Sequence, residues 1–226
     1  MVKALKESRQ FNISVEGINC ERLYFNHLSG LINASGKNKY NASIYCRKAS
    51  PTSFAKRNAY KQRCNLKVPY VHIQDVEDFN DKTEEKRFYA LLDELANVET
   101  DFGISYNLGY TNYTFELWIL LHVADMKSPV VDKSSYLKYI NHYFHKSYTS
   151  LNQFKTESEF QGILDKYITF DSVCMAVKRA DAIVRQNEIS GNKCEYYGKF
   201  RFFKDNPDLT VHEIIKIIFN QCQVKI

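Results

Sequence analysis

Three carboxylates come directly after short apolar segments, a position from which they could bind a metal ion. Glu16 follows the segment FNISV, and Asp75 and Glu77 follow VPYVHIQ. Groups that follow parallel strands gather at the carboxyl edge of the sheet, so we expect these three side chains to converge if their strands are neighbours. Positions 75 and 77 would point the same way in an extended backbone, with Val76 turned into the protein.

The chemistry that such a group supports is metal-dependent. Crowded carboxylates raise one another's pKa unless a cation neutralises them, and hard oxygen ligands favour Mg²⁺ or Mn²⁺. The ion would assist phosphodiester cleavage, with Glu16 transferring a proton to or from the reacting oxygens. Asp78 is a further candidate ligand. The alternative is that Glu16 ends a strand by chance and that residues 75–81 form a solvated loop.

The segment between Glu21 and Asp75 is basic throughout, because it holds ten lysines and arginines and no acidic residue. The net charge of the whole chain is only +5, so the positive charge is concentrated here. This asymmetry favours a polyanionic partner such as nucleic acid, and a solvated basic face is the alternative. The candidate contacts to a phosphate backbone are Arg47, Lys48, Lys56, Arg57, Lys61 and Arg63.

The composition is that of an ordinary globular protein. With 226 residues, of which 44% are hydrophobic, the chain can build one domain with a proper core. The six cysteines form no C-x-x-C pair, so we expect reduced thiols rather than a zinc site. No apolar run approaches membrane-spanning length and no secretory segment follows Met1, so we expect a cytoplasmic protein without a membrane partner.

The hydrophobic pattern of the first half predicts strands that alternate with helices. Expected strands cover residues 11–15, 40–46, 68–74 and 102–106, and expected helices cover 19–32, 51–64 and the segment after a cap at 80–81. This alternation predicts an α/β fold with a parallel sheet of about four strands, flanked by helices.

The second half is helical almost throughout. Expected helices cover residues 115–123, 133–145, 157–167, 172–187 and 211–220. The first of these is apolar on nearly every side, which indicates burial. We therefore predict an α/β core over residues 1–112 and a helical part over residues 113–226 that packs on it as one compact domain.

Glu116 and Glu21 lie in helical segments and each has two interpretations. A buried Glu116 needs a partner, so it either caps its helix or belongs to the acidic site. Glu21 either supports a metal site or provides a favourable charge near a helix N-terminus. His122 lies on the same helical face as Phe115, and we predict a core histidine there. Trp118 is also predicted to be core.

Three blocks of the sequence resemble motifs of the RloB family. Residues 16–25, EGINCERLYF, resemble its E-G-x-x-T-E-x-x-Y-F opening. Residues 111–122, TNYTFELWILLH, resemble its S-N-P-x-F-E-L-W-x-x-x-H block, although Tyr113 replaces the proline. Residues 206–212, NPDLTVH, resemble its N-P-x-T-x-V-H segment. The blocks lie in the family's order and cover most of the chain.

The resemblance implies a TOPRIM-type core, which RloB-like proteins are taken to share with the AbiLii proteins of abortive infection. Such a core is a compact parallel sheet with a glutamate after the first strand and an acidic D-x-D pair after the third. Glu16 would be that glutamate and Asp75 the first acid of the pair, whereas Glu77 replaces the second aspartate. The implied activity is Mg²⁺-dependent cleavage, nicking or rejoining of nucleic acid in prokaryotic phage defence, often beside an ATPase.

We therefore expect a Mg²⁺- or Mn²⁺-dependent nuclease that acts on DNA or RNA. The expected catalytic residues are Glu16, Asp75, Glu77 and Glu116, and the expected metal ligands are Glu16, Asp75, Glu77, Asp78 and Glu21. Two alternatives remain open: a non-catalytic nucleic-acid-binding subunit of an ATPase-containing complex, and a nucleotide phosphotransfer enzyme that uses the same acids. An oligomer is compatible with each of them.

Overall fold

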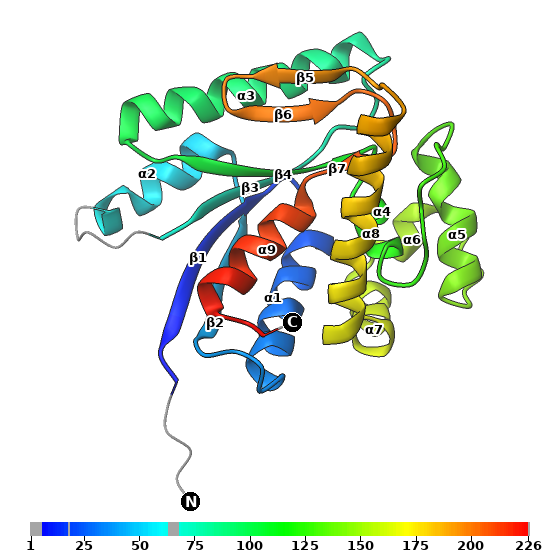
Figure 1. Cartoon of the computed structure of the whole chain (residues 1–226), viewed down its shortest axis with the longest axis horizontal. Coiled ribbons are helices and arrows are strands. Elements are labelled where there is room, and N and C mark those ends of the chain that lie inside the picture. Colours follow the sequence, from blue (N-terminus) through cyan, green and yellow to red (C-terminus); the bar gives the residue numbers. More distant parts are fainter. Residues whose placement is uncertain (1–5, 18, 63–67, 226) are drawn as a thin grey trace, which may run out of the picture.

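A computed structural model describes residues 6–17, 19–62 and 68–225, and its centre is a five-stranded sheet (Figure 1). The strand order is β2-β1-β3-β4-β7. The parallel strands are β1 (Ser8–Val15), β2 (Asn41–Lys48), β3 (Tyr70–Asp75) and β4 (Tyr106–Asn112), and the short β7 (Asp208–Leu209) runs antiparallel to β4. The predicted α/β class with a mostly parallel sheet is confirmed.

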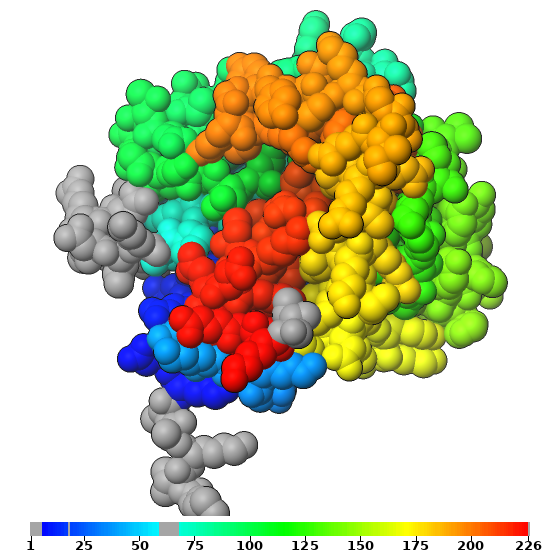
Figure 2. Space-filling view, viewed as in Figure 1, coloured from blue at the N-terminus to red at the C-terminus, as the bar shows by residue number. Residues whose placement is uncertain are grey.

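Helices cover both faces of this sheet (Figure 1). On one face lie α1 (Cys20–Ala34) and the C-terminal helix α9 (Val211–Cys222), which share a core with the apolar side chains of β1. On the other face lie α2 (Pro51–Gln62) and α3 (Lys82–Phe102), which share a second core with β3 and β4. Figure 2 shows α9 at the surface, bordered by α8. The sheet is therefore buried on both sides, as parallel sheets usually are.

The second half of the chain is mainly helical, as predicted. Its helices are α4 (Glu116–Leu120), α5 (Tyr136–Tyr143) after a 3₁₀ turn (Lys133–Ser135), α6 (Leu151–Phe154), α7 (Glu157–Tyr167) and α8 (Phe170–Ile189). A hairpin of β5 (Cys194–Tyr197) and β6 (Phe200–Phe203), which no sequence pattern predicted, lies along α3 (Figure 1). Aromatic side chains hold it there, since Phe202 packs against Phe88 and Tyr197 against Tyr89.

Two predicted elements are wrong in extent, and each has a local cause. The strand predicted over residues 102–106 begins only at Tyr106, because Phe102 ends α3 and Gly103 closes that helix in a left-handed conformation (φ 64°). The helix predicted over residues 115–123 ends at Leu120. Its backbone tightens there, since the His122 N–H donates to the carbonyl of Ile119, three residues back.

No helix in the described ranges is long and apolar enough to cross a lipid bilayer. The described cysteines, Cys20, Cys46, Cys174, Cys194 and Cys222, form no disulfide bond with one another.

The close approach of α9 to the sheet depends on Gly109 in β4. A Cβ atom at this position would lie 2.6 Å from Cδ1 of Ile73 and 2.9 Å from Cγ1 of Ile214, and both side chains are buried. We therefore expect Gly109→Ala to lower the free energy of unfolding by about 1–3 kcal/mol through overpacking, measured by urea denaturation.

The matched control is Gly162→Ala in α7, where an added Cβ meets no atom within 4 Å. Alanine favours helices, so this variant should be more stable than the wild type by about 0.5–1 kcal/mol. Equal stability of the two variants would contradict the proposed packing of α9.

Candidate active site

The pairing of β1 with β3 brings two of the predicted acids to one edge of the sheet. Val15 is level with Ile73 in the parallel register, and the Glu16 N–H donates to the Ile73 carbonyl at 3.3 Å. Glu16 therefore lies beside Gln74, whose side-chain amide donates to the Glu16 carboxylate. Asp75 follows at the end of β3, so the sheet itself sets the neighbourhood of these two acids.

Strand β4 positions the acids that follow β3. Asp75 is level with Thr111, whose hydroxyl donates to the Asp75 carboxylate at 2.9 Å. The strand ends at Asp75, and Glu77 has a left-handed backbone (φ 63°), so the expectation of an extended chain through residue 77 is wrong. Instead, the Glu77 N–H donates to the Tyr113 carbonyl at 2.9 Å. Val76 is buried, as predicted.

A cavity of about 280 Å³ lies beside these acids and adds two more. Glu21 comes from the first turn of α1, and Glu116 is the first residue of α4; both are buried. The acids that line this cavity are Glu16, Glu21, Asp75, Glu77 and Glu116. Gly17 also lines it, and a Cβ there would overlap the Glu21 carboxylate, so glycine lets Glu21 lie against the turn after β1.

Lys155 brings a positive charge into this cavity, although it is not among the site residues predicted from the sequence. It directly follows α6, and its Nζ lies 2.8 Å from Oε1 of Glu116. Burial opposes its charge, but Glu116 and Asp75 hold the pKa of Lys155 above its ordinary value. The second oxygen of Glu116, Oε2, is buried and has no hydrogen-bond partner within the described part of the chain.

Loss of water and mutual repulsion raise the pKa values of the acids. Burial is the main cause for Asp75, with Glu21 and Glu116 as further causes, and its pKa is well above the ordinary value. Burial and then Glu116 raise the pKa of Glu21. The Glu16 carboxylate is partly shielded inside the cavity, and this shielding together with Glu77 raises its pKa as well. These three groups therefore carry a cost of ionisation that a cation would relieve.

The donor set fits a hard divalent cation. Five carboxylates and one ammonium line the cavity, and the buried Oε2 of Glu116 has a free position as an acceptor. Among the described residues, however, these carboxylates do not bring three donor atoms within 4.8 Å of one another. Several are held by other partners: Glu77 by Lys133 at 2.6 Å, and Glu16 by Gln74.

A second cavity, of about 470 Å³, begins at the same edge and extends along α3. Glu16, Asp75 and Glu77 line it too, and it adds Lys48 from the end of β2 and Arg87 from α3. Arg87 pairs with Glu84 at 2.9 Å, and the acids Glu84, Glu16 and Glu77 raise its pKa. The acidic edge is therefore continuous with cationic groups that could contact a phosphate.

The remaining predicted residues lie outside these cavities in the part of the chain that the structure describes. The Asp78 carboxylate accepts the Asn80 N–H at 2.8 Å and so shapes the turn before α3. Arg47 lies at the end of β2, and Lys56 and Arg57 lie on α2; all three side chains are exposed. The side chain of Lys61, and Arg63 as a whole, lie outside the described residues.

The fold and the acidic edge of the sheet define the class of protein. It is an α/β protein with carboxylates gathered at the carboxyl ends of β1 and β3, the arrangement that its sequence motifs imply. A model of the RloB-like protein family matches residues 11–218, nearly the whole chain. The chain therefore belongs to the RloB-like family. No curated protein sequence matches it significantly.

The raised pKa of Asp75 makes stability depend on pH. The folded protein holds this proton more tightly than the unfolded chain, whose carboxyl has an ordinary pKa of 3.8. The proton on Asp75 therefore adds to the free energy of unfolding in full below about pH 4, and this contribution is lost as the pH rises through the folded-state pKa. Asparagine does not ionise, so we expect Asp75→Asn to lack this loss of stability. At neutral pH and in chelator, the free energy of unfolding of Asp75→Asn should exceed that of the wild type.

The measurement is urea unfolding from pH 4 to 8, with and without Mg²⁺. Asp171→Asn is the matched control, because the Asp171 side chain is 88% exposed. The control should keep the wild-type pH profile. If Asp75→Asn kept it too, Asp75 would not be the group that ionises at a cost.

Proposed function

We propose that this RloB-like chain is a Mg²⁺- or Mn²⁺-dependent nuclease that cleaves phosphodiester bonds of DNA or RNA. The observation that carries the proposal is the convergence of five carboxylates from β1, β3, α1 and α4 on one cavity, with raised pKa values at Asp75, Glu21 and Glu16. A bound cation would stabilise the charge that develops on the scissile phosphate. The residues that would hold it are Glu16, Asp75, Glu77 and Glu116, with Glu21 in support.

Glu16 is the candidate for proton transfer. Its side chain is exposed and lines both cavities, so it can reach a substrate, and loss of water together with Glu77 raises its pKa above the ordinary value. A raised pKa makes a carboxyl group a better proton acceptor than an ordinary carboxylate, which suits a proton-transfer role. The amide of Gln74 donates to the Glu16 carboxylate and thereby fixes its orientation.

Cationic side chains at the edge are suited to the phosphate itself. Lys155 neutralises Glu116 on one side of the acids, and Arg87 and Lys48 line the cavity on the other. The guanidinium of Arg87 offers paired donors that match phosphate oxygens. In this arrangement the substrate backbone would pass along the acidic edge, between Lys155 on one side and Arg87 and Lys48 on the other.

Cleavage of labelled DNA and RNA with Mg²⁺, with Mn²⁺ and with chelator tests the proposal. We expect cleavage only with metal, and a loss of at least about 100-fold in Glu16→Gln and Asp75→Asn, because each removes a charged or proton-transferring group from the site. Asp171→Asn should cleave at the wild-type rate. Undiminished cleavage by Asp75→Asn, or in chelator, would exclude this mechanism.

The exposed bases of β2 and α2 are proposed to contact the nucleic-acid backbone. Each phosphate contact releases counterions, so Arg47→Ala, Lys56→Ala and Arg57→Ala should each weaken binding similarly for all sequences and reduce the salt slope of log K by about 1. Lys193→Ala is the control, because Lys193 is 83% exposed and lies before the β5–β6 hairpin. Binding titrations from 50 to roughly 200 mM salt measure this. If the salt slopes of these three variants equal the slope of Lys193→Ala, the nucleic acid binds a face of the protein other than the one formed by β2 and α2.

We also propose that the nuclease acts in prokaryotic phage defence, beside an ATPase partner, in the cytoplasm. This setting follows from the resemblance to RloB and AbiLii motifs. Bacteria that express the wild type, Asp75→Asn or Asp171→Asn under phage challenge test it. Protection against phage should be lost with Asp75→Asn and kept with the wild type and Asp171→Asn. Equal protection by the three proteins would show that defence does not depend on the acidic site.

A further inference from the structure

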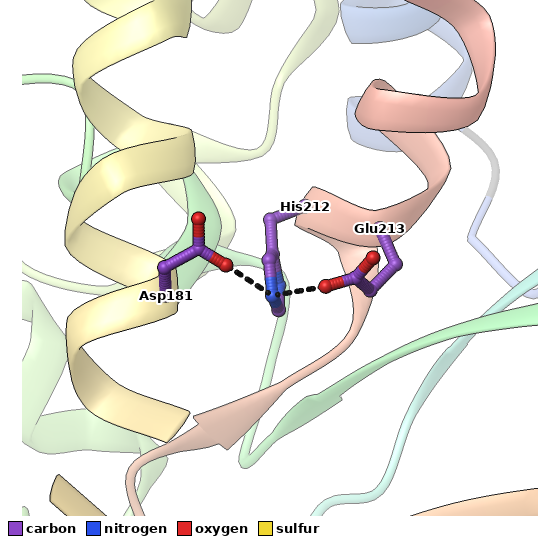
Figure 3. Close-up of side chains that lie close together, drawn as sticks. All are labelled: Asp181, His212 and Glu213. Carbon is purple, nitrogen blue, oxygen red and sulfur yellow. Dashed lines mark ion pairs between the residues drawn. The ribbon is translucent and has the colours of Figure 1, made fainter. Parts of the chain in front are cut away.

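A second group of potential metal ligands lies away from the acidic edge. Asp181 on α8 and His212 and Glu213 at the start of α9 point toward one another (Figure 3). Within residues 6–17, 19–62 and 68–225, this is the group of three whose donor atoms all lie within 4.8 Å of one another. His212 and Glu213 also line a cavity of about 440 Å³ between β4, β6 and α9. Among the described residues, this cavity shares no lining residue with the acidic cavities.

The distances suit a single tetrahedral ion. Nε2 of His212 lies 3.0 Å from Oε1 of Glu213 and 3.4 Å from Oδ1 of Asp181. Ligands that each stand about 2.1 Å from a tetrahedral ion are roughly 3.4 Å apart. One imidazole nitrogen with two carboxylate oxygens is a donor set of Zn²⁺ and similar transition metals, whereas Mg²⁺ prefers oxygen alone.

The histidine is oriented for this role. Its side chain is 2% exposed, and its Nδ1 has no hydrogen-bond partner within the described structure. The polar contacts of the ring are therefore made through Nε2, the atom aimed between the two carboxylates (Figure 3). A ring buried in this way needs a strong interaction at that atom to offset the loss of water.

Lys216 now supplies the positive charge that the two carboxylates require. Its Nζ lies 2.5 Å from Oδ1 of Asp181 and 2.9 Å from Oε1 of Glu213. The side chain is one third exposed, so the ammonium can move into water when another cation takes its place. We propose that Asp181, His212 and Glu213 form a second metal site, for a transition-metal cation of the Zn²⁺ type, with Lys216 as the competing cation.

Such an ion would join α8 to α9. Asp181 lies in the middle of α8, and the other two ligands lie in the first turn of α9, the helix that covers the sheet beside β4. The site therefore predicts a metal-dependent gain in stability, which is a readout independent of nuclease activity.

Lys216→Met in the full chain is the decisive variant, because it removes the competing cation and leaves the three ligands. In metal-free protein its melting temperature should fall below that of the wild type, since Asp181 and Glu213 lose their counter-charge. Added Zn²⁺ should restore it, and calorimetric titration should show Zn²⁺ binding at least ten-fold tighter than in the wild type. Mg²⁺ should have little effect.

Asp181→Asn/Lys216→Met is the matched control, since it keeps His212 and the fold but removes one ligand. It should bind Zn²⁺ at least ten-fold more weakly than Lys216→Met and show no recovery of melting temperature. Equal Zn²⁺ binding by the two variants, or no effect of Zn²⁺ on folded Lys216→Met, would overturn the site. The gain in Zn²⁺ affinity caused by Lys216→Met should be the same when Asp75→Asn is also present, which separates this site from the acidic edge.

Discussion

The parallel register between β1 and β3 is the constraint on which the acidic edge depends. Because Val15 is level with Ile73, Glu16 leaves its strand beside Gln74, and Asp75 follows directly. A shift of one residue would turn the apolar side chains of β1 away from their core, so the register is fixed by burial rather than by the acids. The position of the carboxylates thus follows from hydrophobic packing, and their repulsion is a cost that the fold must carry.

The helical second half offsets that cost. The segment around α4 is entirely buried, so Glu116 cannot turn away to solvent, and the ammonium of Lys155 meets it at 2.8 Å. Only the Glu116 side of this ion pair is buried, and loss of Lys155 would leave the buried Glu116 charge without compensation. Lys155 therefore links α6 to the acids at the end of the sheet, and the second half of the chain helps to build the same site as the first.

Local patterns in the sequence predicted the elements that local forces determine. The structure confirms the predicted strands before Glu16 and Asp75 and most of the predicted helices. It also confirms a core histidine at position 122, since the His122 ring lies 3.1 Å from the hydroxyl of Tyr24 and 2.9 Å from the carbonyl of Trp118. Gly103 after a long helix was an available signal for a helix end. Lys155 and the β5–β6 hairpin were missed because contacts between distant segments define them, and periodicity within a segment does not report such contacts.

The acidic edge and the cluster of Asp181, His212 and Glu213 differ in how much of their negative charge is neutralised by nearby lysines. At the acidic edge, five carboxylates share a cavity with Lys155, and burial raises the pKa values of three of them. At the junction of α8 and α9, two carboxylates are bridged by Lys216 and face His212, and the pKa of Glu213 is lowered to about 2, chiefly by its bond to His212. The first cluster holds more carboxylates than cationic groups, so the proposed metal ion would bind there without displacing another cation. The second already holds one, so a metal ion must replace it, and the donor atoms rather than the net charge decide which metal succeeds.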